Sequence, residues 1–173
     1  MAGSPDDTTY DLAAALDDEQ TFAAVRHFFE EGIPFNQVLG LTIRYIRKGD
    51  VGLNMPFKPE LIGNPMVPAL HGGTLSAMAD AAGGAAVFSA LPLGDSVSTI
   101  DLRIDYLRPA APVDSFAEAR IVRIGGRVGV ARIQVWQAPV AENASREAVT
   151  GEEPERVLVA EATGVYSIKR RKR

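Results

Sequence analysis

The 173-residue sequence contains no cysteine and only two histidines, His27 and His71. Without cysteine there is no disulfide, no thiolate nucleophile and no zinc–sulfur site, and two histidines are too few for a histidine-rich metal site. A net charge of −4 argues against a general nucleic-acid binder. Residues 1–19 are acidic and lack the basic and apolar regions of a signal peptide. We therefore expect a cytoplasmic protein without a cysteine- or histidine-rich metal site and without nucleic acid as a partner.

Charge is almost missing between His71 and Ala90, where Asp80 is the one charged residue. A helix of about five turns that is apolar on nearly all sides should be buried, either in a folded domain or in a membrane. Its length permits a membrane span, but Asp80 near the middle, four glycines and few large aliphatic residues argue against insertion. We expect a buried helix in a soluble domain. A lone carboxylate there is costly unless it is paired or used, which makes Asp80 a candidate functional residue.

Hydrophobic patterns before this helix predict a second helix and a hairpin. Acidic residues at 17–19 precede apolar residues at helical spacing, and Gly32 and Pro34 should end that helix. Alternation over 41–46 and 51–57 predicts two antiparallel strands joined by a turn at 49–50. The proline-rich residues 58–69 read as a loop that leads to the central helix.

The sequence after the central helix alternates strongly and predicts a strand over 98–106, with one packed face and one polar face. The packed face comprises Ser98, Ile100, Leu102, Ile104 and Tyr106, and the polar face comprises Thr99, Asp101, Arg103 and Asp105. Further strands are expected at 115–124, 127–137 and 157–168, with a loop over 138–155. The fold class is therefore α+β, with an antiparallel sheet of five to six strands around one long helix and an extra N-terminal helix. We expect one domain over 17–168, between a disordered segment at 1–16 and a basic tail at 169–173.

Three motifs carry a resemblance to a known family. His71-Gly72-Gly73 followed by Asp80 forms an HGG-x6-D pattern, residues 105–110 read DYLRPA at a strand end, and residues 123–127 form a basic glycine turn. Taken together, they make the sequence resemble PaaI-like hotdog-fold acyl-CoA thioesterases from about residue 35 to residue 168. The resemblance implies the hotdog fold and hydrolysis of an acyl-CoA thioester without a cofactor.

The resemblance also implies roles for individual residues. Asp80 matches the catalytic carboxylate, which acts as nucleophile or as general base. Gly72 matches the residue whose backbone N–H polarises the thioester carbonyl. His71 matches a histidine that orients the loop or the substrate, and Thr99 matches a residue that positions water or the carboxylate.

One position departs from the family pattern. Relatives carry Asn or Gln six residues before the histidine, where this chain has Pro65, so the neighbouring Asn64 is the candidate for that role. Gly73, Arg123 and Arg127 are candidates for binding the substrate. The two arginines suit the phosphates of coenzyme A, since guanidinium groups bind phosphate, or they are surface charges that keep a hairpin soluble. The basic tail is either a solvated, disordered end or a segment that binds an anionic partner, including the phosphates of coenzyme A.

The spacing of the two main catalytic candidates predicts a shared site. Gly72 and Asp80 lie eight residues apart, which is about 12 Å along a helix. A reacting carbonyl must lie roughly 3 Å from both groups. Two antiparallel copies of the helix meet this condition and one copy does not, so we expect a homodimer. A dimer of dimers stays open, because the polar strand face at 101–105 meets either water or a second dimer.

Two other functions stay open from the sequence. One is a catalytically silent protein that binds acyl-CoA or another ligand, and the other is a hotdog hydratase or dehydratase, which would need an acid–base pair with His71. The acyl group is not identified. Candidates for lining its pocket are Met55, Phe57, Met66, Met78 and Phe88.

Overall fold

The computed structural model describes residues 12–138 and 156–171. The chain begins with helix α1 (Leu12–His27), the π-helical turn η1 (Phe28–Gly32) and helix α2 (Pro34–Leu39). The long helix α3 (Gly72–Phe88) follows the first two strands and a small two-stranded sheet. The strands are β1 (Thr42–Arg47), β2 (Asp50–Met55), β3 (Ile62–Asn64), β4 (Ala69–Leu70), β5 (Ser96–Tyr106), β6 (Ser115–Ile124), β7 (Val128–Gln137) and β8 (Val157–Lys169).

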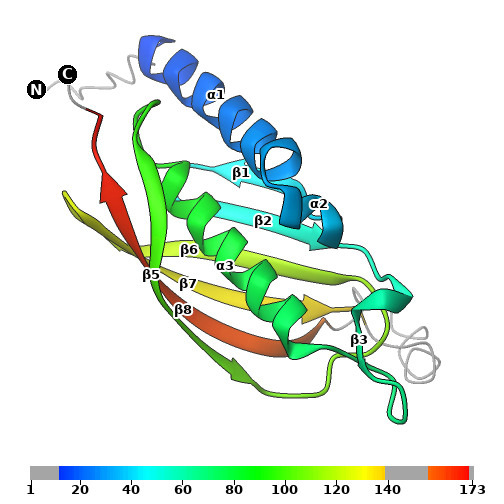
Figure 1. Ribbon diagram of the computed structural model, residues 1–173. Coiled ribbons are helices and arrows are strands. Elements are labelled where there is room, and N and C mark those ends of the chain that lie inside the picture. Colours follow the sequence, from blue (N-terminus) through cyan, green and yellow to red (C-terminus); the bar gives the residue numbers. More distant parts are fainter. Residues whose placement is uncertain (1–11, 139–155, 172–173) are drawn as a thin grey trace, which may run out of the picture.

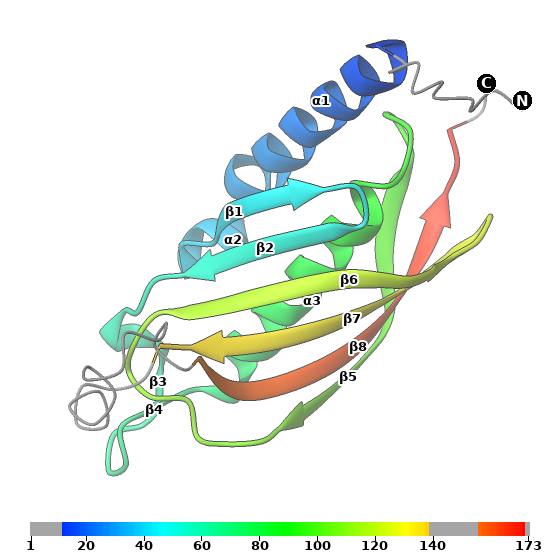
Figure 2. The same cartoon turned by 180° about the vertical axis from the view of Figure 1, so that it is seen from behind.

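Six strands form one sheet in the order β1-β2-β6-β7-β8-β5, and every neighbouring pair is antiparallel. The sheet curves around α3, which runs along its concave face (Figure 1). Helices α1 and α2 lie on the same side, next to β1, so none of the helices that the structure describes covers the other face of the sheet (Figure 2). The predicted α+β fold, with a long central helix and an extra N-terminal helix, is therefore confirmed.

Small residues let α3 approach the sheet closely. Its buried positions include Ala79, Ala82 and Gly83. The ring of Tyr166 on β8 is 1% exposed. It fits between α3 and the sheet because Gly83 on the helix and Gly164 on β8 have no side chain, and a Cβ at either position would overlap its hydroxyl. No helix among residues 12–138 and 156–171 is both long and apolar enough to cross a membrane.

The predicted faces of β5 are wrong at its first half. The register against β8 shifts between Thr99 and Asp101, so Ile100 forms a β-bulge and is 59% exposed. A bulge moves the following side chains to the opposite face. Thr99 before the bulge therefore faces α3, together with Leu102 and Ile104 after it.

Three segments differ from the prediction outside β5. The N-terminal helix starts at Leu12 rather than near residue 17, and Pro34 begins α2, since proline is favoured at the first position of a helix. The expected loop at 58–69 contains a short 3-10 turn (Pro59–Leu61) and the β3–β4 pair. The expected loop at 138–155 lies, from residue 139 on, outside the described residues.

The beginning of the basic tail is exposed but hydrogen-bonded to the folded domain. Lys169 is the last residue of β8. Arg170 donates to the carboxylate of Asp95 at 2.8 Å and to the carbonyl of Gly126 at 3.2 Å. The Asp95 side chain is only 7% exposed and also accepts the backbone N–H of Arg171 at 2.9 Å. Residues 172–173 lie outside the described residues.

Candidate active site

His71 caps the N-terminus of α3. Its Nδ1 accepts the backbone N–H of Gly73 at 2.9 Å, and its backbone N–H donates to the carbonyl of Leu61 at 2.8 Å. The carbonyl of His71 accepts both the N–H and the hydroxyl of Thr74, at 2.9 and 2.8 Å. A side-chain acceptor at this position satisfies one of the N–H groups that the first turn of a helix leaves open. The histidine of the motif therefore fixes the first turn of α3.

Gly72 presents its backbone N–H at the same helix end. No residue that the structure describes accepts a hydrogen bond from it, whereas the N–H of Gly73 is occupied by His71. The Gly72 carbonyl accepts the hydroxyl of Tyr106 at 2.9 Å, and the Tyr106 ring would lie 3.2 Å from a Cβ at Gly72. Glycine thus leaves room for Tyr106. An open N–H at the positive end of the helix dipole suits a developing negative charge.

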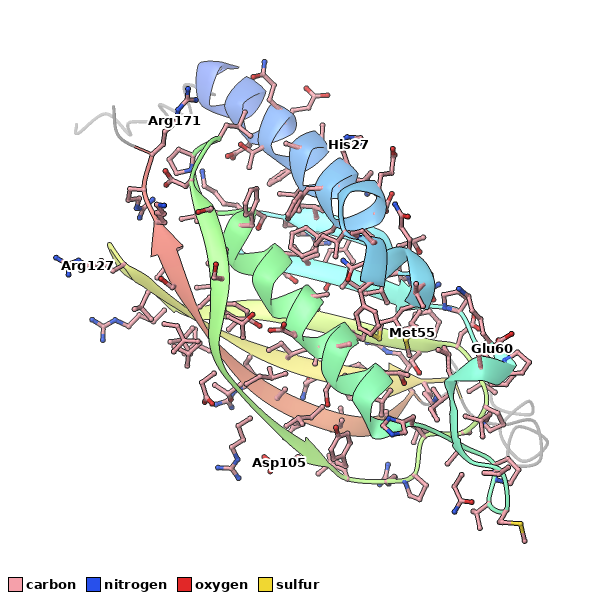
Figure 3. The ribbon with its side chains drawn as sticks, viewed as in Figure 1. His27, Met55, Glu60, Asp105, Arg127 and Arg171 are labelled. Atoms are coloured by element: carbon pink, nitrogen blue, oxygen red, sulfur yellow. The ribbon has the colours of Figure 1, made fainter. Side chains whose placement is uncertain are left out.

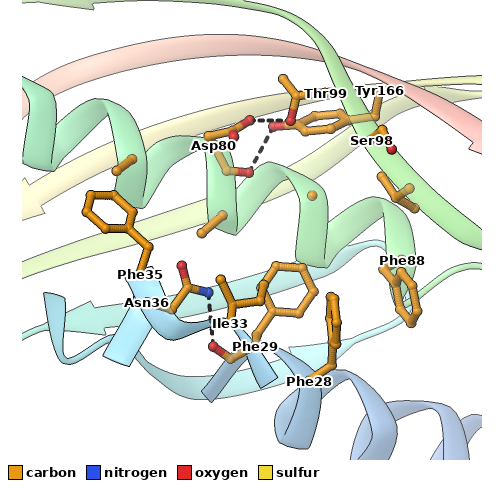
Figure 4. A pocket seen from close by; sticks show the side chains of 14 residues that line it. Phe28, Phe29, Ile33, Phe35, Asn36, Asp80, Phe88, Ser98, Thr99 and Tyr166 are labelled. Atoms are coloured by element: carbon orange, nitrogen blue, oxygen red, sulfur yellow. Dashed lines mark hydrogen bonds between the residues drawn. The ribbon is translucent and has the colours of Figure 1, made fainter. Parts of the chain in front are cut away.

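Asp80 lies two turns further along α3. Its Oδ1 accepts the hydroxyl of Thr99 at 2.8 Å, and the hydroxyl of Tyr166 donates to its backbone carbonyl at 3.2 Å (Figure 4). Burial and the negative charge of Asp80 both raise the pKa of Tyr166, so this hydroxyl stays protonated and serves as a donor. Thr99 on β5 therefore orients the Asp80 carboxylate, and Tyr166 on β8 binds the backbone of the helix turn that carries Asp80.

A pocket of about 390 Å³ opens beside Asp80, within the range of small-molecule sites. It lies between α3, β5 and the helical segment η1–α2 (Figure 4). Most of its lining is apolar; besides Asp80, the polar side chains in it come from β5, β8 and α2. The lining residues are Phe28, Phe29, Ile33, Phe35, Asn36, Ala77, Asp80, Ala81, Gly84, Phe88, Val97, Ser98, Thr99 and Tyr166.

Only part of this pocket was predicted from the sequence. Of the five candidate lining residues, Phe88 lines it, Met55 and Met78 are in the core, Phe57 is partly buried against that core, and Met66 is 87% exposed. The helical spacing that includes Phe28 and Phe29 predicted a packing face, with no sign that the same side chains line a pocket. Tyr166 carried no signal in the sequence, because it alternates like any other strand residue.

The remaining candidate residues lie away from Asp80 within one protomer. The Oδ1 of Asn64, in β3, accepts the backbone N–H of Met66 at 2.9 Å, so this side chain stabilises a local turn and does not line the pocket. Arg127 projects from the β6–β7 turn at the left of Figure 3, and Asp105 lies at the lower side, near the end of β5. The start of β7 packs on Val87 at the C-terminal end of α3, about 22 Å along the helix from Gly72. Arg123 is exposed in the last part of β6.

The chain is similar in sequence and in fold to known proteins. Residues 68–144 match the model of the thioesterase superfamily. The chain is 33% identical over 137 residues to the medium/long-chain acyl-CoA thioesterase YigI of Salmonella typhimurium, covering 72% of this chain and 88% of that protein. It is 29% identical over 170 residues to YigI of Escherichia coli, covering 91% and 99%.

A solved structure from Shewanella oneidensis, described as related to the thioesterase superfamily, superposes with a TM-score of 0.69 at 26% identity, covering 87% of this chain and 96% of that one. The fold, with its curved antiparallel sheet around α3, agrees with these sequence matches. The chain belongs to the hotdog-fold thioesterase superfamily.

Proposed function

We propose that the protein hydrolyses acyl-CoA thioesters to a free acid and coenzyme A. The observation that carries the proposal is the carboxylate of Asp80, which Thr99 orients at the edge of an apolar pocket. The similarity to the YigI proteins, named as medium/long-chain acyl-CoA thioesterases, supports the same substrate class for this chain. A thioester is already activated, so one carboxylate and one polarising N–H suffice for the reaction.

The proposed site is shared between two protomers. Helix α3 is continuous from Gly72 to Phe88, so Gly72 and Asp80 of one protomer lie about 12 Å apart and do not reach the same carbonyl. Strand β5 is the last strand of the sheet and pairs with β8 on one side only. A twofold pairing of two β5 strands would continue the sheet and satisfy the open backbone edge. It would also bring the two α3 helices together in opposite directions.

In this dimer Asp80 works with the Gly72 N–H of the partner subunit. As a general base, Asp80 takes a proton from water while the water oxygen attacks the thioester carbon. As a nucleophile, its carboxylate forms an anhydride that water then hydrolyses. In both routes the negative charge on the carbonyl oxygen is stabilised by the N–H, and collapse of the intermediate breaks the carbon–sulfur bond and releases the thiolate of coenzyme A, which then takes up a proton.

The test is thiol release from a panel of acyl-CoA thioesters by the wild type and by Asp80→Asn. Asparagine keeps the size of the side chain but neither accepts the proton nor attacks, so we expect a rate at least ~100-fold lower with an unchanged melting temperature. Label found in Asp80 after a single turnover in ¹⁸O-labelled water would identify the nucleophile route, because water that opens the anhydride at the Asp80 carbonyl leaves its oxygen there, whereas the general-base route labels only the product acid. Normal turnover by Asp80→Asn would remove Asp80 from the reaction.

The two other functions give different results. A silent binding protein would release no thiol from any acyl-CoA while still binding the ligand. A hydratase would need His71 as an acid or base, but its Nδ1 is engaged with Gly73 and its place before the first turn of α3 separates it from Asp80 of the same protomer. The roles of Gly73, Arg123, Arg127 and Asn64, the cytoplasmic location and the choice between dimer and dimer of dimers stay predictions.

A further inference from the structure

The pocket follows one face of α3, and the residues of that face form its floor. Asp80, Gly84 and Phe88 succeed each other at intervals of four, and Ala77 and Ala81 lie beside them. Residues three and four apart share a face of a helix. The floor next to Asp80 is therefore made of glycine and alanine, and the next large side chain along it is Phe88.

Aromatic rings from the N-terminal segment meet Phe88 at this end of the pocket. Phe28 stacks on Phe88 with ring centroids 6.0 Å apart and an angle of 17° between the rings. Phe29 contacts Phe88 edge-on at 6.4 Å and Phe28 edge-on at 5.5 Å. Both belong to the π-helical turn η1, a rare element that is frequent at functional sites. Figure 4 shows Phe28 and Phe88 at one end of the pocket and Phe35 at the other.

We propose that this pocket takes the acyl chain of the substrate and that the Phe28–Phe88 stack sets the longest chain it accepts. The inference rests on the proposed function and adds the chain length to it. Asp80 and Phe88 lie eight residues apart, about 12 Å along α3. An extended chain advances roughly 1.2 Å per bond, as an extended peptide backbone does. The groove therefore holds a medium-length acyl chain of about eight to ten carbons.

This geometry predicts how affinity depends on chain length. Each methylene group buried in an apolar site should tighten binding about fourfold. The gain should continue while the chain lies over Ala81 and Gly84 and should stop when its end reaches Phe88. Chains longer than about ten carbons should bind no more tightly than the optimum, because their ends meet the stacked rings.

Substitutions in the stacked rings and on the floor should move this limit in opposite directions. Phe28→Ala and Phe88→Ala remove the stop and should extend the limit by about two to four carbons; Phe28 is 46% exposed, so its removal is the milder change. Gly84→Ala adds a methyl group on the floor at ordinary contact distance, 3.7 Å from Tyr166 and 3.8 Å from Phe29. It should shorten the limit by about two carbons, and alanine is a better helix former than glycine, so the variant should fold.

Phe35→Ala is the matched control. It makes the same change in the same pocket but at the opposite end, so it should leave the chain-length limit unchanged even if it weakens binding of every chain. Gly126→Ala is the control for the added methyl group, since nothing lies within 4 Å of a Cβ there.

Two measurements separate this inference from the proposed function. The first is the dissociation constant of S-alkyl coenzyme A thioethers, which carry chains of about four to sixteen carbons and resist hydrolysis. The second is kcat/KM for the matching acyl-CoA thioesters. A limit near eight to ten carbons in both, moved up by Phe28→Ala and down by Gly84→Ala, is the expected result. Binding with this profile but no hydrolysis would refute only the proposed function. Affinity that is flat with chain length, or a limit that neither variant moves, would overturn the inference.

Discussion

The substitution Gly83→Ala is a test of stability, because the packing and the helix propensity predict changes of opposite sign in the free energy of unfolding. In a helix interior, replacing glycine with alanine normally stabilises a protein by up to about 1 kcal/mol. At Gly83 the new Cβ would overlap the hydroxyl of Tyr166 and lie 2.9 Å from its Cζ and 3.1 Å from Cδ1 of Ile133. Tyr166 is buried between α3 and the sheet, and its ring lies against Gly164, where an added Cβ would also overlap the hydroxyl, so the ring must shift to make room for the methyl group. We therefore expect Gly83→Ala to destabilise the protein.

The size of the effect follows from two opposing contributions. Overpacking a tight core by one methyl group costs about 1–3 kcal/mol, and the helix preference of alanine returns up to about 1 kcal/mol. The net loss in the free energy of unfolding should be about 1–2 kcal/mol. For a chain of this length, that loss lowers the melting temperature by about 2–8 °C.

A double-mutant cycle with Tyr166→Phe isolates the cause. Removing the hydroxyl costs about 1 kcal/mol through the lost bond to the Asp80 carbonyl, but it also empties the space that the methyl group added by Gly83→Ala needs. The double variant should therefore be more stable than the sum of the two single changes by at least about 0.5 kcal/mol. Urea denaturation of the four proteins supplies the values. A stabilised Gly83→Ala protein, or strict additivity, would refute this account of the packing.

Three further predictions concern the carboxylate, the bound tail and the open strand. Thr99→Val keeps the shape of the side chain but loses the bond to Asp80, so steady-state kinetics should show kcat about tenfold lower at a similar KM; an unchanged kcat would count against a positioning role. Asp95→Ala removes the partner of Arg170 and should cost about 1–2 kcal/mol in urea denaturation, whereas an unaltered midpoint would show that the pair contributes nothing. Ile100→Asp introduces one negative charge in each of the two β5 strands that the proposed dimer pairs, and these like charges repel each other. Light scattering should then find a monomer, and the activity assay should find no thioesterase activity. An active monomer would contradict the shared site.

Most of the architecture was predictable because it follows from regular periodicity. The apolar stretch after His71 and the alternating strands led to the fold, and the HGG-x6-D motif led to the family and to Asp80. The predicted faces of β5 were wrong where a single inserted residue interrupts the two-residue alternation of the strand. Ile100 continues the alternation of its strand in the sequence, but the bulge turns it outward and brings Thr99 to face Asp80.

The pocket was harder to predict because its walls come from distant segments. Phe28 and Phe29 follow an ordinary helical pattern in the sequence, and only the π-helical turn directs both rings toward Phe88. Arg170 belongs to a run of five basic residues that resembles a solvated end, while its partner Asp95 lies 75 residues earlier in the chain. Contacts of this kind depend on the tertiary fold, which local composition does not encode.

The catalytic chemistry and the choice of acyl chain are assigned to different regions of the chain, because η1 contributes rings to the pocket but no group to the reaction. The groups proposed for the chemistry come from α3 and β5, whereas the rings proposed to limit the acyl chain come partly from the first 40 residues. Changes in the N-terminal segment can then alter which substrates enter without disturbing the carboxylate or the helix end. Related chains that share the central helix but differ in this segment should accordingly share a reaction and differ in the acyl chains they accept.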